Sequence, residues 1–519
     1  MTAGRIPGRD RPGASRFEEY NFEEYKMKNV KDIASRKARP VKVVQFGEGN
    51  FLRAFADRMI DEANEKGTFD GNIVLVKPIE YGSLDAFREQ DCFYTVLMRG
   101  RDNGETVNSP RVVTSVCRAV AAVEEYRDFI DLAGEPELSV IISNTTEAGI
   151  VFDATDRFDA EPPLTYPGKL TKFLYERYVR FGGDPSRGVM ILPVELIEDN
   201  GKKLKECVFG LADLWELPGD FKKWLSSACL FTSTLVDRIV TGYPKGEGEA
   251  EKIWEELGYR DRLLDICEPF GLWVIETDDI PRAKSVLDLE AAGLPVVYTD
   301  NMKPYRERKV RILNGAHTSF VPAAFLAGRS IVRECMSDPV VRPFIDAAVY
   351  REIAPFVKLP PDEVKKFADS VCERFDNPFI DHALISIALN SVSKWRARVL
   401  PSLKDFVAAR GIAPPCLTMS FAALCDFYAR GEKTENGFYG TRDAGKYEIR
   451  DDPAVIDFFA RFGKEEDVVL RFARNTDFWG EDLTKIGNFG QGVYLWHKVF
   501  TVDGPEAALK YAVKMNADF

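Results

Sequence analysis

The chain has little histidine and no closely spaced cysteine pair. Its 519 residues include 3 histidines and 9 cysteines, and no two cysteines stand in a Cys-x-x-Cys spacing. A zinc site needs several such side chains close together, so no metal is expected, and only a carboxylate metal site would be easy to build. An odd, dispersed set of cysteines also argues against a disulfide framework and predicts buried, reduced thiols in a cytoplasmic protein.

Long apolar segments and excess positive charge are absent as well. No apolar run reaches the roughly 18 residues that a membrane-spanning helix needs. A net charge of −12 disfavours a nucleic-acid surface or an anionic membrane partner, but it allows a local basic pocket for a small anion. The first residues lack the apolar core of a secretory signal. We interpret residues 1–39 as a tail and expect the part before Met27 to be dispensable.

Short apolar runs alternate with helical stretches in the first part of the chain. Such patterns are typical of a parallel sheet with helices on both faces, so an α/β, Rossmann-like, doubly wound domain is predicted over residues 40–293. The runs that read as strands are residues 41–46, 73–76, 139–143 and 188–194. After about residue 294 helical periodicity dominates, which predicts a mainly α-helical domain over residues 294–519.

A glycine turn follows the first predicted strand. In VVQFGEGNFLRAF, Gly47 and Gly49 stand between strand and helix, where glycine permits a tight turn and the close approach of a pyrophosphate. The third position of the usual Gly-x-Gly-x-x-Gly pattern is Leu52, so a simple turn is the alternative. Arg53, one turn into the helix, could reach a phosphate or could be a solvated surface arginine. The setting favours a dinucleotide site.

Two further strand ends would border such a site. Lys77 ends the second strand, where NAD-binding proteins often carry an acid for the ribose, so this strand does not decide between NAD and NADP. In SNTTEAGI, Asn144, Thr145 and Thr146 follow the third buried strand and would face the binding crevice. A polar loop with a helix cap is the alternative interpretation of this segment.

A polar trio lies in the helical pattern KPYRERKVRILNGAHTSF. A regular α-helix, at about 100° per residue, would place Lys309, His317 and Asn314 near 0°, 80° and 140°, on one broad side. A desolvated lysine can exchange a proton near neutrality, and an amide can stabilise a developing oxyanion, so the trio suits metal-free reduction of a carbonyl. Gly315 costs about 1 kcal/mol relative to alanine inside a helix, which predicts a close approach there. An exposed lysine, a capping asparagine and a core histidine are the alternative.

Together these motifs resemble the long-chain mannitol dehydrogenase family of polyol and sugar-acid dehydrogenases. The stretches that carry the resemblance are QFGEGNFLRAF, SNTTEAGI, STLVDRIVTGYP, KPYRERKVRILNGAHT and RFDNPFIDH. The family's Gly-x-Gly-x-Phe-x-Arg segment binds NAD, which implies NAD as the cofactor. With the neighbouring strand ends, the cofactor-binding residues expected are Phe46, Gly47, Gly49, Asn50, Phe51, Arg53, Lys77, Asn144, Thr145 and Thr146.

The resemblance also implies roles for residues in the rest of the chain. The family's Lys-x4-Asn-x2-His signature makes Lys309 the acid–base, Asn314 an oxyanion donor and His317 a substrate-orienting residue. The substrate-binding residues expected are Asp237, Arg374, His382 and Asn200. The branch that the chain resembles most reduces D-tagaturonate to D-altronate with NADH. A small sugar acid is therefore the expected partner, without nucleic acid or membrane, and the oligomeric state stays open.

Two positions depart from the mannitol-type pattern. Leu196 stands in place of a second oxyanion asparagine, and His382 stands in place of a lysine. Both changes agree with a different substrate, whose carboxylate could bind Arg374, His382 or Arg238. The alternatives are a fructuronate reductase, a mannitol or arabinitol dehydrogenase, or a non-catalytic dinucleotide-binding protein. The intact trio argues against the last of these.

Overall fold

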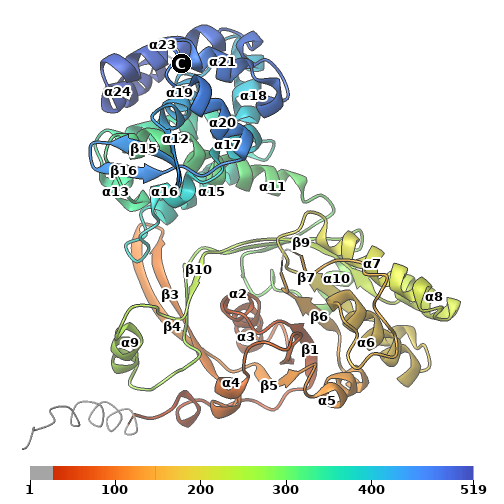
Figure 1. Cartoon of the computed structure of the whole chain (residues 1–519). Helices are drawn as coiled ribbons and strands as arrows, with labels where there is room; N and C mark the ends of the chain where they lie inside the picture. The colour runs from red at the N-terminus through yellow and green to blue at the C-terminus, as the bar shows by residue number, and fades with distance from the viewer. Residues whose placement is uncertain (1–26, 147, 518–519) are drawn as a thin grey trace, which may run out of the picture. The chain divides into compact units, whose positions relative to one another are not determined.

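The computed structural model describes residues 27–146 and 148–517, which form two units (Figure 1). Unit 1 contains the described residues up to Met98 together with Asn108–Asp300, and unit 2 contains Arg99–Val107 together with the described residues from Asn301 onward. The expected boundary at residue 294 falls inside unit 1, because strand β13 (Val296–Thr299) pairs with a strand of that unit.

A six-stranded parallel sheet with the order β5-β2-β1-β6-β7-β8 forms the centre of unit 1. Its strands are β1 (Val41–Phe46), β2 (Asn72–Lys77), β5 (Val116–Ala121), β6 (Val140–Ser143), β7 (Met190–Pro193) and β8 (Leu230–Phe231). The strand order reverses between β1 and β6, which is the switch point of a doubly wound sheet. The predicted Rossmann-like fold is confirmed, and all four strand predictions coincide with strands of this sheet.

Helices cover both faces of the sheet, as predicted. Val43 and Ile73 contribute to the core on the side of α3 (Arg58–Lys66), whereas their neighbours Val44 and Val74 contribute to the core on the opposite side. The helices on that opposite side are α5 (Tyr126–Asp131), α6 (Tyr166–Arg180), α7 (Asn200–Leu214) and α8 (Gly219–Ser227). Successive residues are thus buried on alternate faces, and for this reason the strands read as continuous apolar runs.

Unit 1 also contains strands and helices that the sequence analysis did not predict. The strands are β9 (Ser233–Asp237), β10 (Val240–Gly242), β11 (Asp265–Cys267), β12 (Leu272–Glu276), β13, and the bases of β3 (Tyr94–Asp102) and β4 (Glu105–Val113), whose tip Arg99–Val107 belongs to unit 2. The helices are α4 (Asp85–Glu89), α9 (Glu249–Leu257) and α10 (Ile280–Val286), whereas α2 (Asn50–Leu52) begins the helix that was predicted after the glycine turn. The turn between β3 and β4 is Asn103-Gly104, and both residues have positive φ, as a tight hairpin turn requires.

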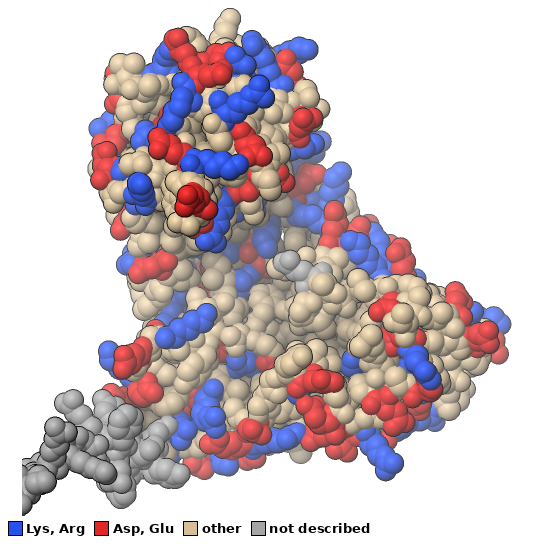
Figure 2. Space-filling model, in the orientation of Figure 1, with Lys and Arg blue, Asp and Glu red and all other residues tan. Residues whose placement is uncertain are grey.

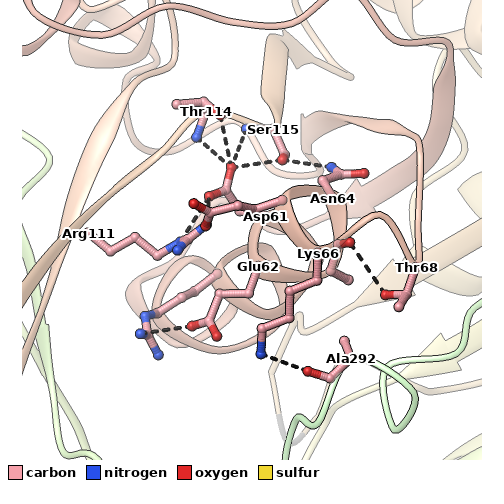
Figure 3. Close-up of polar contacts among 12 residues, drawn as sticks. Asp61, Glu62, Asn64, Lys66, Thr68, Arg111, Thr114, Ser115 and Ala292 are labelled. Atoms are coloured by element: carbon pink, nitrogen blue, oxygen red, sulfur yellow. Dashed lines mark hydrogen bonds and ion pairs between the residues drawn. The ribbon is translucent and has the colours of Figure 1, made fainter.

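A buried carboxylate attaches α3 to the segment that joins β4 to β5 (Figure 3). Asp61 accepts hydrogen bonds from the backbone N–H groups of Thr114 and Ser115 at 2.8 and 3.0 Å. Its second oxygen pairs with Arg111 at 2.7 Å, and Asn64, one turn further on, donates to the hydroxyl of Ser115 at 2.8 Å. The helix that follows the glycine turn is therefore held firmly at its far end.

Part of the expected N-terminal tail packs on unit 1. Residues 1–26, including those expected to be dispensable, lie outside the described residues. Val30 is fully buried, and its N–H donates to the carbonyl of Arg260 at 3.0 Å. The guanidinium of Arg36 donates to the carbonyls of Thr114 and Val116 at 2.9 and 2.6 Å. The segment from Val30 to Arg36 is therefore attached to the unit, in contrast to the prediction of a tail up to residue 39.

Unit 2 is mainly helical, as predicted. Every residue of α19 (Pro415–Ala429) is buried, so this helix forms the centre of the unit. The other α-helices are α11 (Lys303–Arg308), α12 (Gly315–Leu326), α13 (Val332–Ser337), α14 (Val341–Ala347), α15 (Pro361–Phe375), α16 (Leu384–Ile387), α17 (Ser391–Arg398), α18 (Leu400–Arg410), α20 (Pro453–Phe462), α21 (Val468–Arg474), α22 (Thr476–Trp479), α23 (Phe489–Val502) and α24 (Pro505–Asn516). A small antiparallel sheet of β14 (Glu432–Thr434), β15 (Gly437–Arg442) and β16 (Gly445–Glu448) was not predicted.

The state of the cysteines and the distribution of surface charge agree with the amino-acid composition. All nine cysteines are free, and all except Cys117 are buried, as the sequence predicts. Acidic and basic side chains are interspersed over the face seen in Figure 2. Within residues 27–146 and 148–517, no helix has the length and apolar character needed to cross a membrane, and no three His, Cys, Asp or Glu side chains are grouped to hold a metal ion.

Candidate active site

The glycine turn after β1 is shaped by the neighbouring strand. Gly47 has a φ of +113°, which L side chains rarely adopt, and a Cβ there would lie 2.8 Å from the carbonyl oxygen of Asn144. Gly49 has a φ of −67° and precedes α2, and a Cβ on it would meet no atom within 4 Å. Gly47 is therefore required by the protein itself, whereas the space beside Gly49 is open to a ligand.

A cavity of about 360 Å³ lies at these strand ends, where doubly wound sheets bind ligands. It is lined by Gly47, Glu48, Gly49, Asn144, Thr145 and Thr146 from the β1 and β6 ends, and by Thr165, Tyr166 and Lys169 from the start of α6. Helix N-termini and a lysine attract anionic groups such as phosphates. The open space at Gly49 and these groups fit the phosphates of a dinucleotide, and five of the predicted cofactor residues line the cavity.

Lys77 has a different role from the expected one. Its ammonium group is buried and donates to the Glu124 carboxylate at 2.8 Å and to the carbonyls of Glu80 and Gly82 at 3.1 and 3.3 Å. Lys77 therefore closes the loop after β2, and its hydrogen bonds are used within the protein. Glu48 is the acidic residue among the described residues that line the cavity, and partial burial raises the pKa of its carboxyl group.

Arg53 is buried, so the alternative of a solvated surface arginine is wrong. It is 4% exposed, begins a π-helical turn (Arg53–Asp57), and donates to the carbonyl of Leu263 and to the side chain of Asn50. Its guanidinium lies 3.7 Å from the buried carboxylate of Asp265. Arg53 and Asn50 thus connect the glycine turn to β11, and neither lines the cavity.

Of the two phenylalanines expected at the cofactor, Phe46 is a core residue and Phe51 is partly buried against the core. Phe46 is fully buried, and its ring lies 5.2 Å from that of Tyr166 and 5.8 Å from that of Phe129, between centroids. Phe51 stacks on Phe55 at 5.0 Å. Neither lines the cavity, so these two residues support the turn from beneath.

A buried glutamate that sequence analysis passed over organises the β6 side of the cavity. Glu195 is 2% exposed and accepts hydrogen bonds from the N–H and the hydroxyl of Thr145, both at 3.1 Å, and from Ser143 at 3.1 Å. Burial raises the pKa of Glu195, and these hydrogen bonds oppose that effect. The hydroxyl of Thr145 is therefore used within the protein.

Lys309, Asn314 and His317 lie in one continuous helical segment of unit 2, but this helix is not regular. Lys309–Asn314 is a π-helical turn between α11 and α12. Because π-helical hydrogen bonds join residues five apart, Asn314 lies close to one full turn beyond Lys309, which corrects the wide angle expected for a regular helix. π-Helical turns of this kind occur frequently at functional sites.

The close approach predicted at Gly315 is made by the protein itself. A Cβ on Gly315 would lie 3.0 Å from the carbonyl oxygen of Arg398, the last residue of α17. The missing side chain lets the end of α17 pack against the start of α12, between Asn314 and His317.

His317 lies among aromatic rings and cations. Its ring stacks on Phe375 at 4.1 Å between centroids, with the ring of His382 at 5.5 Å. Burial holds the pKa of His317 well below its ordinary value, and the charges of His382, Arg374 and Arg398 add to this effect. Its Nε2 is buried without a hydrogen-bond partner among the described residues. The ring is therefore neutral near pH 7 and can make one further hydrogen bond to a ligand.

The loop after Arg374 is held by the tip of the β3–β4 hairpin, which belongs to the same unit. Arg374 is buried near the end of α15. Arg101 pairs with Asp376 at 2.9 Å, and the Asn377 amide donates to the carbonyl of Arg99 at 3.3 Å. Arg374 and His382 both lie near His317, since the charge of Arg374 acts on that ring and the ring of His382 lies 5.5 Å from it.

The polar residues expected from unit 1 have different surroundings. Asn200 is fully buried and donates its amide to the carbonyls of Pro193, Glu195 and Thr234 at 3.0 to 3.2 Å, so this amide is not available to a substrate oxyanion. Arg238 likewise donates to three backbone carbonyls, so it is not a carboxylate receptor. Asp237 is buried at the end of β9.

Several site residues were passed over although weak signals existed. Glu48 stands between the two glycines of the turn, and Glu195 immediately precedes the unusual Leu196. In SVSKWRAR, Lys394 and Arg398 are four residues apart, a spacing that places them on one helix face. Lys169 has no comparable signal, because only the start of α6 brings it to the cavity.

The fold and these residues define an oxidoreductase that acts on CH–OH groups with a dinucleotide. Residues 41–289 match the mannitol dehydrogenase Rossmann domain, and residues 301–493 match the mannitol dehydrogenase C-terminal domain. The chain belongs to the mannitol dehydrogenase family and is an NAD-linked polyol or sugar-acid dehydrogenase.

Relatives and solved structures agree with this assignment. The chain is 42% identical over 481 residues to altronate oxidoreductase of Enterobacter sp. (strain 638), covering 91% of this chain and 96% of the relative. It is 43% identical over 458 residues to altronate oxidoreductase of Escherichia coli O139:H28, covering 86% and 92%. A substrate-free D-sorbitol dehydrogenase shares the fold at 20% identity with a TM-score of 0.74, covering 93% and 100%. Pseudomonas fluorescens mannitol 2-dehydrogenase, solved with NAD and D-mannitol, does so at 21% with a TM-score of 0.62, covering 95% and 99%.

Proposed function

We propose that the protein reduces D-tagaturonate to D-altronate with NADH, reversibly and with Lys309 as acid–base. The similarity to altronate oxidoreductases over nearly the whole chain carries this proposal. The cations around His317 support it, because a sugar acid brings a carboxylate that a neutral polyol lacks. We also propose a cytoplasmic location, since a reducing compartment preserves nine free thiols.

Each of the three residues of the trio would have a different role at the substrate carbonyl. Bound NADH would supply the hydride to the carbonyl carbon. Lys309 would donate its proton to the carbonyl oxygen, and the amide of Asn314 would stabilise the negative charge that develops there. His317 is neutral, and its unpaired Nε2 would bind a substrate hydroxyl, which orients the carbonyl. Asp237, Arg374 and His382 complete the proposed substrate-binding set.

The cavity of unit 1 supports NAD rather than NADP. The carboxylate of Glu48 lines it and would repel an additional phosphate, while the ammonium of Lys77 is already paired with Glu124. Lys169 also lines the cavity, but it donates to the carbonyl of Leu164 at 2.8 Å, and the charge of Glu80 acts on it. In this proposal Gly47, Gly49, Asn144, Thr145 and Thr146 hold the dinucleotide.

A substrate panel tests the function. The purified protein is mixed with NADH or NADPH and with D-tagaturonate, D-fructuronate or D-fructose, and the decay of absorbance at the reduced-nicotinamide band is followed. We expect the highest kcat/KM with tagaturonate and NADH. Preference for fructuronate would identify a fructuronate reductase, preference for fructose would identify a polyol dehydrogenase, and no decay with any of them would favour a non-catalytic dinucleotide-binding protein.

A further inference from the structure

Helix α17 brings two cations to the trio. Lys394 and Arg398 are one turn apart on this helix, so they share a face. The helix is fixed against α12 where the carbonyl of Arg398 approaches Gly315, two residues before His317. Both cations lie close enough to His317 for their charges to lower its pKa, in addition to burial. The two side chains therefore belong to the surroundings of the trio.

The charge of this pair is not balanced by the protein. Arg398 is partly buried, and it forms no ion pair or hydrogen bond with a carboxylate in the described part of the chain. Lys394 donates to the carbonyl of Ile387 at 3.0 Å. The one carboxylate that acts on Lys394 belongs to Asp451, which also accepts hydrogen bonds from Tyr428 and from the N–H of Val392. Partly desolvated cations without a full set of counter-charges form a site for an anion.

The same site contains Arg374 and His382 in a chain whose net charge is −12. Burial lowers the pKa of His382, so its imidazole is not a competing charge, and the charges of this site that the described residues do not fully compensate are those of Lys394 and Arg398. His317 is neutral and Asn314 carries an uncharged amide, so neither of them needs a counter-charge. In an enzyme of this class, the anion that binds beside the trio is therefore part of the substrate.

We propose that Lys394 and Arg398 bind the carboxylate of the substrate and thereby select sugar acids over neutral ketoses. This inference rests on the proposed function. The guanidinium of Arg398 can hold a carboxylate through two parallel hydrogen bonds, and Lys394 adds a second charge. A bound neutral ketose would exclude water from both cations without giving them a counter-charge. The pair therefore weakens the binding of a neutral ketose and strengthens the binding of a sugar acid.

The test compares Arg398→Gln and Lys394→Gln with the matched control Arg396→Gln, which removes the same charge from an exposed position of the same helix. The full-length proteins are assayed with D-tagaturonate and with the neutral ketose D-tagatose at saturating NADH. For each site variant we expect the KM for tagaturonate to rise about 10- to 100-fold, as loss of a charge-assisted hydrogen bond implies, with kcat little changed. The kcat/KM for tagatose should stay the same or rise, and the control should match the wild type.

Each result separates the inference from the function on which it rests. An unchanged KM for tagaturonate in both site variants, with an active wild type, would overturn the inference alone. An equal loss of kcat/KM with tagaturonate and with tagatose, together with a lower Tm, would show that Lys394 and Arg398 hold α17 in place. That result would overturn the inference as well. A wild-type protein that reduces no hexuronate would overturn the proposed function and the inference together.

Discussion

Gly47→Ala and Gly49→Ala each add one methyl group to the turn after β1, with opposite expected consequences. At Gly47 the φ of +113° and the 2.8 Å approach to the Asn144 carbonyl both oppose a side chain. Backbone strain and overpacking each cost about 1–3 kcal/mol, so the loss should be roughly 3 kcal/mol. At about 2–4 °C per kcal/mol for a unit of this size, the Tm should fall by roughly 6–12 °C.

At Gly49 the φ is −67° and the new methyl group would meet no atom within 4 Å. The entropic gain of about 0.4–1 kcal/mol on replacing glycine and the preference for glycine over alanine at an N-cap nearly offset each other. The Tm should therefore stay within about 2 °C of the wild type. If the pyrophosphate lies beside Gly49, however, the methyl group occupies its space, and the Kd for NADH should rise about tenfold or more.

Two measurements on each variant decide the matter. Thermal unfolding followed by circular dichroism gives the Tm, and a titration followed by nicotinamide fluorescence gives the Kd for NADH. A Gly49→Ala protein that binds NADH as tightly as the wild type would refute the placement of the pyrophosphate at this turn. A Gly47→Ala protein with an unchanged Tm would refute the argument from backbone strain.

Three further substitutions test other residues. Lys309→Ala should lower kcat by about 10²–10⁴-fold while the Kd for NADH is unchanged, and substantial residual turnover would remove the lysine from the acid–base role. Glu48→Gln should raise the ratio of NADPH to NADH turnover about tenfold, and a constant ratio in initial-rate assays would contradict a selective role for the carboxylate. Burial raises the pKa of Asp57 from 3.8 to about 7, so the folded state holds a proton that the unfolded state has lost, and the free energy of unfolding should fall by up to roughly 4 kcal/mol between pH 4 and pH 7. Asp57→Asn should reduce this pH dependence of the free energy of unfolding, measured by urea titrations at several pH values. An unaltered pH dependence would contradict the raised pKa of Asp57.

The strands of the central sheet could be predicted because burial on both faces leaves only apolar residues in them. The hairpin β3–β4 could not be predicted in this way, since its second strand is largely exposed and alternates irregularly. Its Asn103-Gly104 turn was nevertheless a usable signal. Attachment of residues 30–36 to unit 1 depends on the carbonyl of Arg260, more than 200 residues away, and no local pattern carries that information.

The motifs located the candidate site but not the use of each side chain. Arg53, Lys77 and Asn200 have the chemistry that a cofactor or substrate needs, yet each uses its hydrogen bonds within the protein. The partner of Arg53 is the carbonyl of Leu263, which is 210 residues further along the chain. Residue type and spacing indicate which groups a side chain can bind. Only the folded structure shows whether its hydrogen bonds are already made within the protein.

Gly315 illustrates how a local signal and a distant contact combine. Sequence predicted a close approach because a glycine inside a helix is otherwise costly, but it could not name the approaching group. That group is the carbonyl of Arg398, whose oxygen lies 3.0 Å from the place that a Cβ on Gly315 would take, so the same contact that requires glycine also fixes the helix that carries Lys394. A Cβ at position 315 would press most closely on the carbonyl of Arg398 at the end of α17, whereas its distance of 3.6 Å to the carbonyl of Val310 is ordinary van der Waals contact. If Lys394 and Arg398 bind the carboxylate, as proposed, a side chain at position 315 should disturb recognition of the carboxylate more strongly than proton transfer, although Gly315 stands next to Asn314 in the trio.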